Sequence, residues 1–252
     1  MDRTEKLKIT HKDILLIAEN TLFDVEYQPI FSIFSSPLIP PSSLVLLGYE
    51  AFPRFSINGF KYSPEEVFSA CKDNEELLNM LEVLIKKIHF KKRPDKSVKV
   101  FINLSPQSFR SENARSFWIN FLLEHQNYVV ELIEPYSIKE RESTLLFAEK
   151  LKANNICFAI DDFFKEGAVF SGKVVRMSKI IKLDMGIIEK VKNSSRFKSF
   201  ISVFILKNVK KGKTIILEGV ESKDDFTLAL ELGVSHCQGY FFSNSFVYST
   251  AP

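Results

Sequence analysis

Seven polar residues in this sequence each follow a short apolar run, and five of them are carboxylates. Carboxylates that converge on one place raise each other's pKa and destabilise the fold unless cations neutralise them. Oxygen ligands without Cys or His suit hard divalent ions such as Mg²⁺ or Mn²⁺. We therefore expect a divalent-metal site among Glu50, Asn103, Glu131, Asp161, Asp162, Lys182 and Glu218.

The adjacent pair Asp161 and Asp162 predicts two ions that share a ligand. Two divalent ions about 3.5–4 Å apart can activate a water and hold a phosphodiester for in-line displacement. Lys182 could orient that water or stabilise developing charge, and Glu218 could accept a proton. Each residue taken singly has a plainer interpretation, because a glutamate at a strand end is usually solvated or salt-bridged and Lys182 could be the partner of a buried acid. The set as a whole favours the metal site.

The apolar runs are short and rich in β-branched and aromatic residues, which is typical of buried strands in parallel sheets. The segments between them have helical periodicity, and Ser105, Ser137 and Ser222 are expected N-caps. The predicted strands cover 45–49, 98–102, 128–130, 156–160, 179–181, 214–217 and 236–237, and the predicted helices cover 64–90, 106–126, 137–154, 194–209 and 222–232.

Strands that alternate with helices in this way indicate a parallel α/β fold. An open doubly wound sheet usually has a glycine-rich first loop and one switch point, but no GxGxxG occurs here and the polar strand ends are spread along the chain. In a TIM-like (β/α)8 barrel such residues meet at one mouth. We therefore predict this barrel as a single domain over 1–252, with an N-terminal helical extension at 1–24 and a Pro/Ser-rich loop insertion at 35–43 in the first hairpin.

The composition excludes several other classes of protein. The 252 residues are 45% hydrophobic with a net charge of +3, so the chain can bury a full core and has only a weak bias toward anionic ligands. The cysteines form no CxxC pair and the histidines have no ligand spacing, which argues against a zinc site or a Ser-His-Asp triad. No run reaches the roughly 18 apolar residues of a membrane span, and the start lacks a signal-peptide core. We expect a cytoplasmic protein that binds neither DNA nor RNA duplexes, because its basic clusters lack interleaved aromatic residues.

At these positions the sequence resembles the EAL domain family. Residues 48–55 resemble the signature that gives the family its name, with Phe52 in place of the final leucine. The resemblance runs from about Tyr27 to Phe242. The other motifs follow in the order of the family: Asn103-Leu104-Ser105-Pro106, Glu131-Leu132-Ile133-Glu134, Asp161-Asp162-Phe163, Lys182-Leu183-Asp184, Glu218-Gly219-Val220-Glu221 and Gln238-Gly239-Tyr240.

The resemblance implies a bacterial signalling enzyme that hydrolyses cyclic di-GMP to linear pGpG with two Mg²⁺ or Mn²⁺ ions. It implies that the first ion is bound by Glu50, Asn103, Glu131 and Asp161, and the second by Asp161, Asp162 and Glu218. It makes Lys182 the residue that positions the water and Glu218 the base, with Glu221 in support. It assigns contacts with the dinucleotide to Gln28, Phe52, Arg54 and Gln238, and it makes Glu134 the anchor of the loop after Asp162.

The loop after Asp162 departs from the family pattern, in which Asp-Asp-Phe is followed by Gly-x-Gly. Phe164 and Glu166 replace both glycines. A β-carbon at a residue with positive φ costs about 1 kcal/mol or more, so we expect loop 163–170 to take a different path. Because the family loop helps to shape the second metal site and the dimer interface, turnover and a homodimer are both open questions for this chain.

Three functions therefore stay open. The first is a metal-dependent cyclic di-GMP phosphodiesterase, the second is a non-catalytic cyclic di-GMP receptor that signals through a protein partner, and the third is an interaction module that binds neither ligand. The complete set of metal and water residues favours the enzyme, because a receptor has no need of them. The third function would leave costly unpaired carboxylates in a dry mouth.

Overall fold

The fold is taken from a computed structural model. The structure describes residues 9–20, 23–33, 44–57, 59–71, 73–133, 135, 137–167, 170–245 and 247–249. In this part of the chain, no helix is both long enough and apolar enough to cross a membrane.

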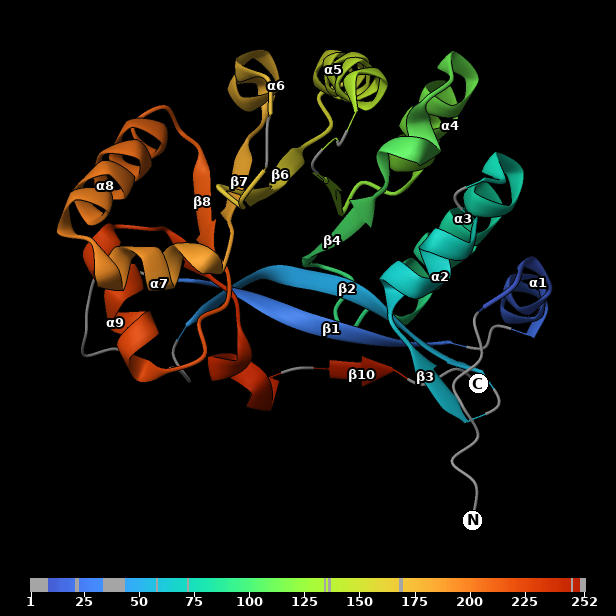
Figure 1. The fold of residues 1–252 in the computed structure, drawn as a ribbon, viewed down its shortest axis with the longest axis horizontal. Helices are drawn as coiled ribbons and strands as arrows, with labels where there is room; N and C mark the ends of the chain where they lie inside the picture. The colour runs from blue at the N-terminus through green and yellow to red at the C-terminus, as the bar shows by residue number, and fades with distance from the viewer. Residues whose placement is uncertain are drawn as a thin grey trace.

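Eight strands close into a barrel (Figure 1). Seven of them are parallel, and β1 closes the ring because it pairs antiparallel with both β2 and β9. The predicted TIM-like α/β barrel is therefore confirmed, with its first hairpin. The barrel strands are β1 (Phe23–Ser32), β2 (Val45–Ile57), β4 (Lys99–Leu104), β5 (Tyr128–Leu132), β6 (Phe158–Phe163), β7 (Ile180–Leu183), β8 (Thr214–Leu217) and β9 (His236–Cys237).

The β1–β2 hairpin is much longer than the other strands and runs across the open side of the helical layer (Figure 1). Its far end pairs with the short strands β3 (Phe60–Tyr62) and β10 (Val247–Ser249). The prediction that a strand ends at Tyr49 and that Glu50 follows it was wrong, because β2 continues to Ile57. Glu50 is thus a mid-strand residue, and alternation places Phe52 and Arg54 on the same face of the hairpin.

Helices cover the barrel on the outside. The predicted caps are confirmed: the hydroxyl of Ser137 accepts from the Glu140 N–H and that of Ser222 from the Asp225 N–H, each in a capping box, while Ser105 caps a short 3₁₀ turn. The segment predicted as one helix at 106–126 is split into that turn and a separate α-helix. The helices are α1 (His11–Asn20), α2 (Pro64–Cys71), α3 (Glu75–Lys92), η2 (Pro106–Phe109), α4 (Glu112–Glu124), α5 (Ile138–Ala153), α6 (Gly172–Met177), α7 (Gly186–Asn193), α8 (Ser195–Val209), α9 (Lys223–Leu232) and η3 (Tyr240–Ser245).

Two additions to the barrel were predicted near the start of the chain, a helical extension and a loop insertion. Helix α1 lies within the predicted extension at 1–24, but the barrel already begins with Phe23 inside that range. The predicted loop at 35–43 lies outside the described residues and stays a prediction.

The core has two layers. Inside the barrel, a small cluster that includes Ile30, Phe101 and Ile216 fills the space below the polar mouth. Most of the aromatic bulk lies outside, between strands and helices, where Phe109 stacks on Phe147 with ring centroids 4.5 Å apart. Burying side chains of this size stabilises the fold by roughly 1.5–3 kcal/mol each. The packing between strands and helices thus fixes the strands whose side chains face the mouth.

Candidate functional site

Lys182 on β7 lies at the centre of an acidic cluster at the barrel mouth. Its side chain is 1% exposed, and its ammonium group contacts carboxylates from three other strands and from the end of a fourth. The structure therefore brings together five of the predicted site residues. The distances from Lys182 Nζ are 2.7 Å to Glu50 Oε2, 2.8 Å to Glu131 Oε1, 3.0 Å to Asp161 Oδ1 and 2.8 Å to Glu218 Oε1.

Strand register explains why Glu50 lies among these residues. Gln28 on β1 is its direct cross-strand neighbour, while Asn103 on β4 is level with Glu131 on β5. The Asn103 side-chain amide donates to Glu50 Oε1 at 2.8 Å. The Gln238 amide, which follows β9, donates to Glu50 Oε2 at 2.5 Å and to Gln28 Oε1 at 2.7 Å. Glu50 is consequently held by donors from three directions.

The cluster has more negative than positive charge. Burial would raise the pKa of Glu50, but the Lys182 charge and the hydrogen bonds of Lys182 and Gln238 outweigh it and lower that pKa. Burial, reinforced by the charge of Glu50, raises the pKa of Glu131 well above its usual value, and burial also raises the pKa of Asp161. Burial raises the pKa of Glu218 to about 8. One ammonium group is therefore too little to keep all four acids ionised.

The side-chain oxygens at the mouth suit the binding of a divalent cation. Every candidate ligand is a carboxylate or amide oxygen, which is what Mg²⁺ and Mn²⁺ prefer. Glu131 Oε2 and Gln238 Oε1 are buried and have no hydrogen-bond partner among the described residues. No three of the described acidic, imidazole or thiol side chains already surround a common metal position; the ammonium group of Lys182 lies among these carboxylates instead. An added cation would supply the missing positive charge.

Asp162 is separate from this cluster. The β6–β7 ladder is irregular between Ile160 and Phe163, and Asp162 lies in this irregularity with φ of 51°. Its carboxylate forms an ion pair with Lys165, with Nζ 2.6 Å from Oδ2. A bulge of this kind redirects a side chain. Asp161 thus faces Lys182, whereas Asp162 is held by its own loop.

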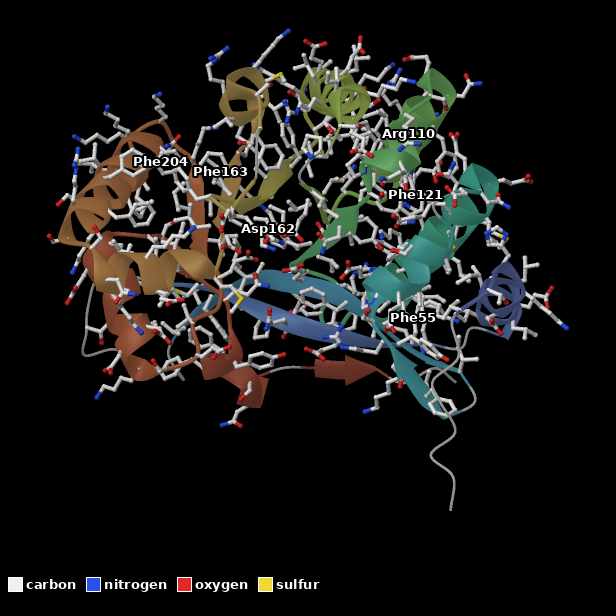
Figure 2. All side chains as sticks on the ribbon, viewed as in Figure 1. Phe55, Arg110, Phe121, Asp162, Phe163 and Phe204 are labelled. Carbon is white, nitrogen blue, oxygen red and sulfur yellow. The ribbon has the colours of Figure 1, made fainter. Side chains whose placement is uncertain are left out.

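The altered loop has, at Phe164, a backbone conformation that favours glycine. Phe164 has φ of 73°, so its backbone is in the left-handed region, where a residue with a β-carbon is strained. Its ring packs edge-on against Phe200 and Phe204 of α8, at centroid distances of 5.8 and 5.0 Å. Figure 2 shows Phe163 beside Phe204 and Asp162 nearer the centre of the barrel. Aromatic packing holds the strained backbone at Phe164, and the expectation that the loop takes a different path from that of the family stays a prediction.

Arg54 is held by a residue that the sequence analysis missed. Its Nε and Nη2 atoms lie 3.0 and 2.9 Å from Glu26 Oε2, and its guanidinium carbon lies 5.3 Å from the centre of the Phe52 ring. Glu26 is opposite Phe52 in the hairpin and two residues before Gln28. Two-residue alternation from Gln28 would have indicated it. Gln28, Phe52 and Arg54 thus share one face of the hairpin, next to the cluster.

Glu221, which was predicted to support catalysis, is not brought to the cluster. The Glu221 side chain is exposed, and its backbone N–H donates to Asp225 Oδ2 at 3.2 Å, which belongs to the cap of α9. These contacts do not connect Glu221 with the cluster, so its supporting role in catalysis stays a prediction. Glu134 lies outside the described residues, so its role as a loop anchor stays a prediction.

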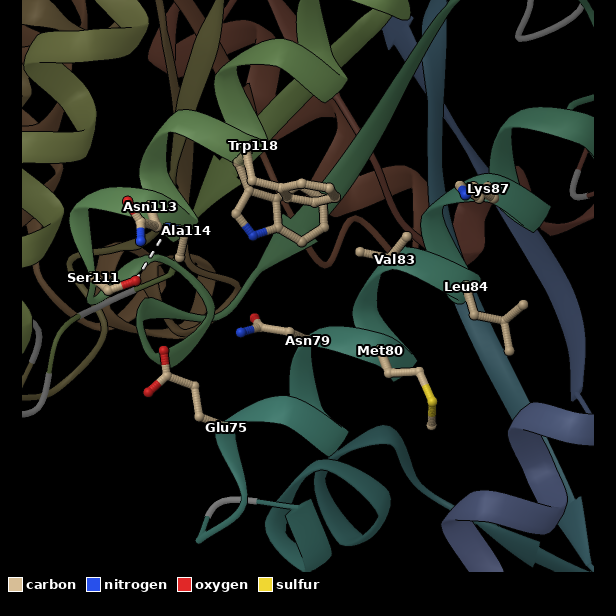
Figure 3. Close-up of a pocket in the computed structure, with 11 residues that line it drawn as sticks. Glu75, Asn79, Met80, Val83, Leu84, Lys87, Ser111, Asn113, Ala114 and Trp118 are labelled. Atoms are coloured by element: carbon tan, nitrogen blue, oxygen red, sulfur yellow. Dashed lines mark hydrogen bonds between the residues drawn. The ribbon is translucent and has the colours of Figure 1, made fainter.

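A groove of about 620 Å³ lies elsewhere, on the outer surface between α3 and α4 (Figure 3). It is lined by apolar side chains such as Val83, Leu84 and Trp118, with Asn79 and Ser111 among the polar ones. None of the residues around Lys182 lines it. The mouth is the better candidate site because acids and amides converge there.

Comparison with known proteins agrees with this geometry. The family model described as EAL domain matches residues 12–245. The chain belongs to the EAL domain family. An EAL relative from Vibrio parahaemolyticus, the cyclic di-GMP phosphodiesterase TpdA, is 25% identical over 217 residues, covering 84% of this chain and 36% of TpdA. The cyclic di-GMP phosphodiesterase RocR of Pseudomonas aeruginosa is 29% identical over 154 residues, covering 58% of this chain and 38% of RocR. This EAL chain therefore spans little more than a third of the length of these relatives.

Solved EAL structures share the fold. The EAL domain of FimX from Pseudomonas aeruginosa, bound to c-di-GMP, has a TM-score of 0.74 and 18% identity, covering 96% of this chain and 97% of that one. The Bacillus subtilis YkuI protein, in complex with c-di-GMP and calcium, has a TM-score of 0.75 and 19% identity, covering 97% of this chain and 60% of that one. At these identities, the likeness supports the EAL fold alone.

Proposed function

We propose that this protein hydrolyses cyclic di-GMP to linear pGpG with Mg²⁺ or Mn²⁺ at the barrel mouth. The observation that carries the proposal is the gathering of Glu50, Glu131, Asp161 and Glu218 around one buried ammonium group, with too little positive charge for four acids. Membership of the EAL family and the cyclic di-GMP phosphodiesterase activity of its relatives support the choice of substrate.

The cation ligands are assigned to residues that the cluster holds in place. A first ion would be held by Glu50, Asn103, Glu131 and Asp161, and a second by Asp161, Asp162 and Glu218. Bound divalent ions supply Lewis acidity, which lowers the pKa of water and polarises a phosphodiester. Asp162 must leave Lys165 to take part, and this is the step in which the altered loop matters.

The remaining site residues bind and orient the reactants. Product pGpG carries a 5′-phosphate, so a water oxygen attacks phosphorus and the P–O3′ bond breaks. Lys182 donates a hydrogen bond that orients this water, and Glu218 takes its proton. The leaving 3′-oxygen takes up a proton in turn. Gln28, Phe52, Arg54 and Gln238 would hold the dinucleotide beside the cluster.

A receptor that binds cyclic di-GMP without turnover is the second candidate. The ion pair between Asp162 and Lys165 favours it, because it removes one assigned ligand from the second ion. This function keeps the hairpin face of Gln28, Phe52 and Arg54 and does not require the second ion.

One experiment separates the candidates. Purified protein is incubated with cyclic di-GMP and Mn²⁺ or Mg²⁺, and the product is identified by chromatography. We expect pGpG, and we expect Glu50→Ala to reduce kcat by about a hundredfold or more, because even partners of metal ligands cost 10–100-fold. Glu231→Gln is the control, since Glu231 pairs with Lys198 on the surface. Absence of product with either metal defeats the enzyme, and calorimetric binding without product then supports the receptor.

The proposal includes a cytoplasmic location. Cys71, Cys157 and Cys237 are all free thiols, which suits a reducing compartment. A homodimer or another protein partner is not needed for the chemistry proposed here.

A further inference from the structure

The end of the barrel opposite the mouth is strongly basic. The loops that lead into β4 to β9 (93–98, 125–127, 154–157, 178–179, 210–213 and 233–235) contain one acid, Asp95. Lys99 and Lys152 flank these loops, as do the acids Glu124 and Glu231. The carboxylate of Asp95 accepts hydrogen bonds from the N–H and hydroxyl of Ser97. We call this end the basic floor; its cations are Arg93, Lys96, Lys99, Lys152, Lys179, Lys210, Lys211 and Lys213.

The exposed cations of the basic floor have no acidic partners. Within the described part of the chain, none of Lys96, Lys99, Lys152, Lys179, Lys210 and Lys211 lies within salt-bridge distance of a carboxylate. Some lysines on the outer helices are paired. Lys150 lies 2.7 Å from Glu112, and Lys198 lies 2.6 Å from Glu231. What distinguishes the basic floor is that six lysines without a carboxylate partner among the described residues gather at one end of the barrel.

The cations of the basic floor are close enough to influence one another. Burial lowers the pKa of Lys213, and the charges of Lys179, Lys211 and Lys152 lower it further. The Lys213 ammonium group is held in place, because it donates to the Val175 carbonyl at 2.8 Å and to the Ser178 carbonyl. Like charges gathered in this way do not stabilise the fold, but they create a positive surface potential that attracts anionic partners.

The charge is spread over a broad face. It comes from loops before β4, β6, β7 and β8, which meet at one end of a closed barrel. No exposed aromatic residue lies in these loops, so they offer no stacking platform for a single-stranded nucleic acid. Seven of the eight cations are lysines, which act as point charges, whereas recognition of nucleic-acid bases and phosphates favours the planar fork of arginine.

We propose that the basic floor docks on an anionic lipid bilayer and leaves the acidic mouth facing solvent. Lysines close to an anionic membrane surface strengthen binding about fivefold each, and the attraction falls off within a Debye length. The mouth, where acids prevail, would be repelled by the same surface. Opposite charges at the two ends of the barrel thus set the orientation.

Vesicle sedimentation with the full chain tests this inference. Phosphatidylglycerol mixed into phosphatidylcholine should bind the protein at low salt, while pure phosphatidylcholine should not, and high salt should release it. The variant Lys99→Gln/Lys179→Gln/Lys211→Gln should bind the anionic vesicles about a hundredfold more weakly, because the loss of each of the three lysines weakens binding about fivefold. The control Lys139→Gln/Lys190→Gln/Lys223→Gln removes the same charge from exposed lysines outside the basic floor and should bind like the parent.

Each other outcome overturns the inference. No sedimentation of the parent protein with anionic vesicles refutes docking. Equal weakening of both triple variants assigns the effect to net charge rather than to this face. Tighter binding to duplex DNA than to anionic vesicles, at equal phosphate concentration, makes the partner a nucleic acid. The assay needs neither nucleotide nor metal, so it succeeds or fails independently of the proposed phosphodiesterase activity.

Discussion

Two neighbouring aspartates are held in opposite ways. Asp161 contacts Lys182 inside the barrel, where strands from distant parts of the chain surround it. Asp162 pairs with Lys165 in its own loop, three residues away. Behind this loop, Phe164 packs on α8 with a strained backbone. The cluster around Lys182 is preorganised by the barrel, whereas the loop depends on local contacts.

The difference matters because the proposed two-ion site uses both aspartates. A residue fixed by several strands keeps its position at little further cost, while one held by an exposed ion pair can be released at the cost of that pair. We infer that the first ion position is built into the fold and that the loop controls the second. The following predictions test this contrast in order of expected effect.

The largest effect is expected at the centre of the cluster. Lys182→Met removes the counter-ion of four carboxylates, two of them fully buried, and in metal-free protein it should lower the free energy of unfolding by about 3–5 kcal/mol. Mg²⁺ or Mn²⁺ should restore part of the loss. Urea unfolding with and without chelator measures both. Lys190→Met, at an exposed lysine, should stay within about 0.5 kcal/mol of the parent. An equally stable metal-free Lys182→Met would contradict the role of the lysine.

The second prediction concerns pH. The pKa of Glu218 is about 8 in the folded protein against 4.5 ordinarily, so the folded state holds this proton more tightly than the unfolded state. Its contribution to stability is complete below pH 4.5 and is lost as the pH rises through about 8. Metal-free protein should lose up to about 1.4 kcal/mol per pH unit in this window for each such proton.

Variants at Glu218 and Glu221 identify the group that causes this dependence of the unfolding free energy on pH. Glu218→Gln should show a shallower loss of unfolding free energy with rising pH, because the amide does not titrate. Glu221→Gln changes an exposed glutamate three residues later and should keep the slope of the parent. Identical slopes for all three proteins would show that Glu218 is not the titrating group.

The third prediction isolates backbone strain in the loop. At Phe164, with φ of 73°, Phe164→Gly should be more stable than Phe164→Ala by about 1 kcal/mol, since only glycine is unstrained there. Phe163, in strand β6, is the matched control, and there the order should reverse because glycine weakens a strand. Thermal unfolding of the four variants provides the comparison. The same order at both positions would mean that the loop is not strained.

The smallest effect is expected at the ion pair of the loop. Both partners are partly exposed, Lys165 by 47% and Asp162 by 26%, so Lys165→Ala should change the free energy of unfolding by less than about 0.5 kcal/mol. Mn²⁺ titration by calorimetry should at the same time show tighter binding of the second ion. Lys173→Ala removes the surface pair with Glu149 and should leave ion binding unchanged. Weaker ion binding in Lys165→Ala would mean that Lys165 supports the second position.

Much of the barrel follows from local patterns. Short apolar runs and capped helical segments predicted the order of the strands and the caps at Ser137 and Ser222, because alternation and capping act over a few residues. The end of β2 was misplaced, since pairing with β1 extends that strand through Pro53 and Arg54, where the local pattern had ended. The short helices α6 and α7 were missed because six or eight residues give little periodicity.

By itself the sequence determined which side chains are available, their order along the strands and their family. Tertiary structure alone decided that Lys182 pairs with Glu50, 132 residues away, that Glu26 holds Arg54, and that Asp161 and Asp162 separate. It also decided that lysines from several loops meet on one face. The physical reason is that electrostatic contacts depend on distance in space, and closing the barrel sets distances that no local pattern contains.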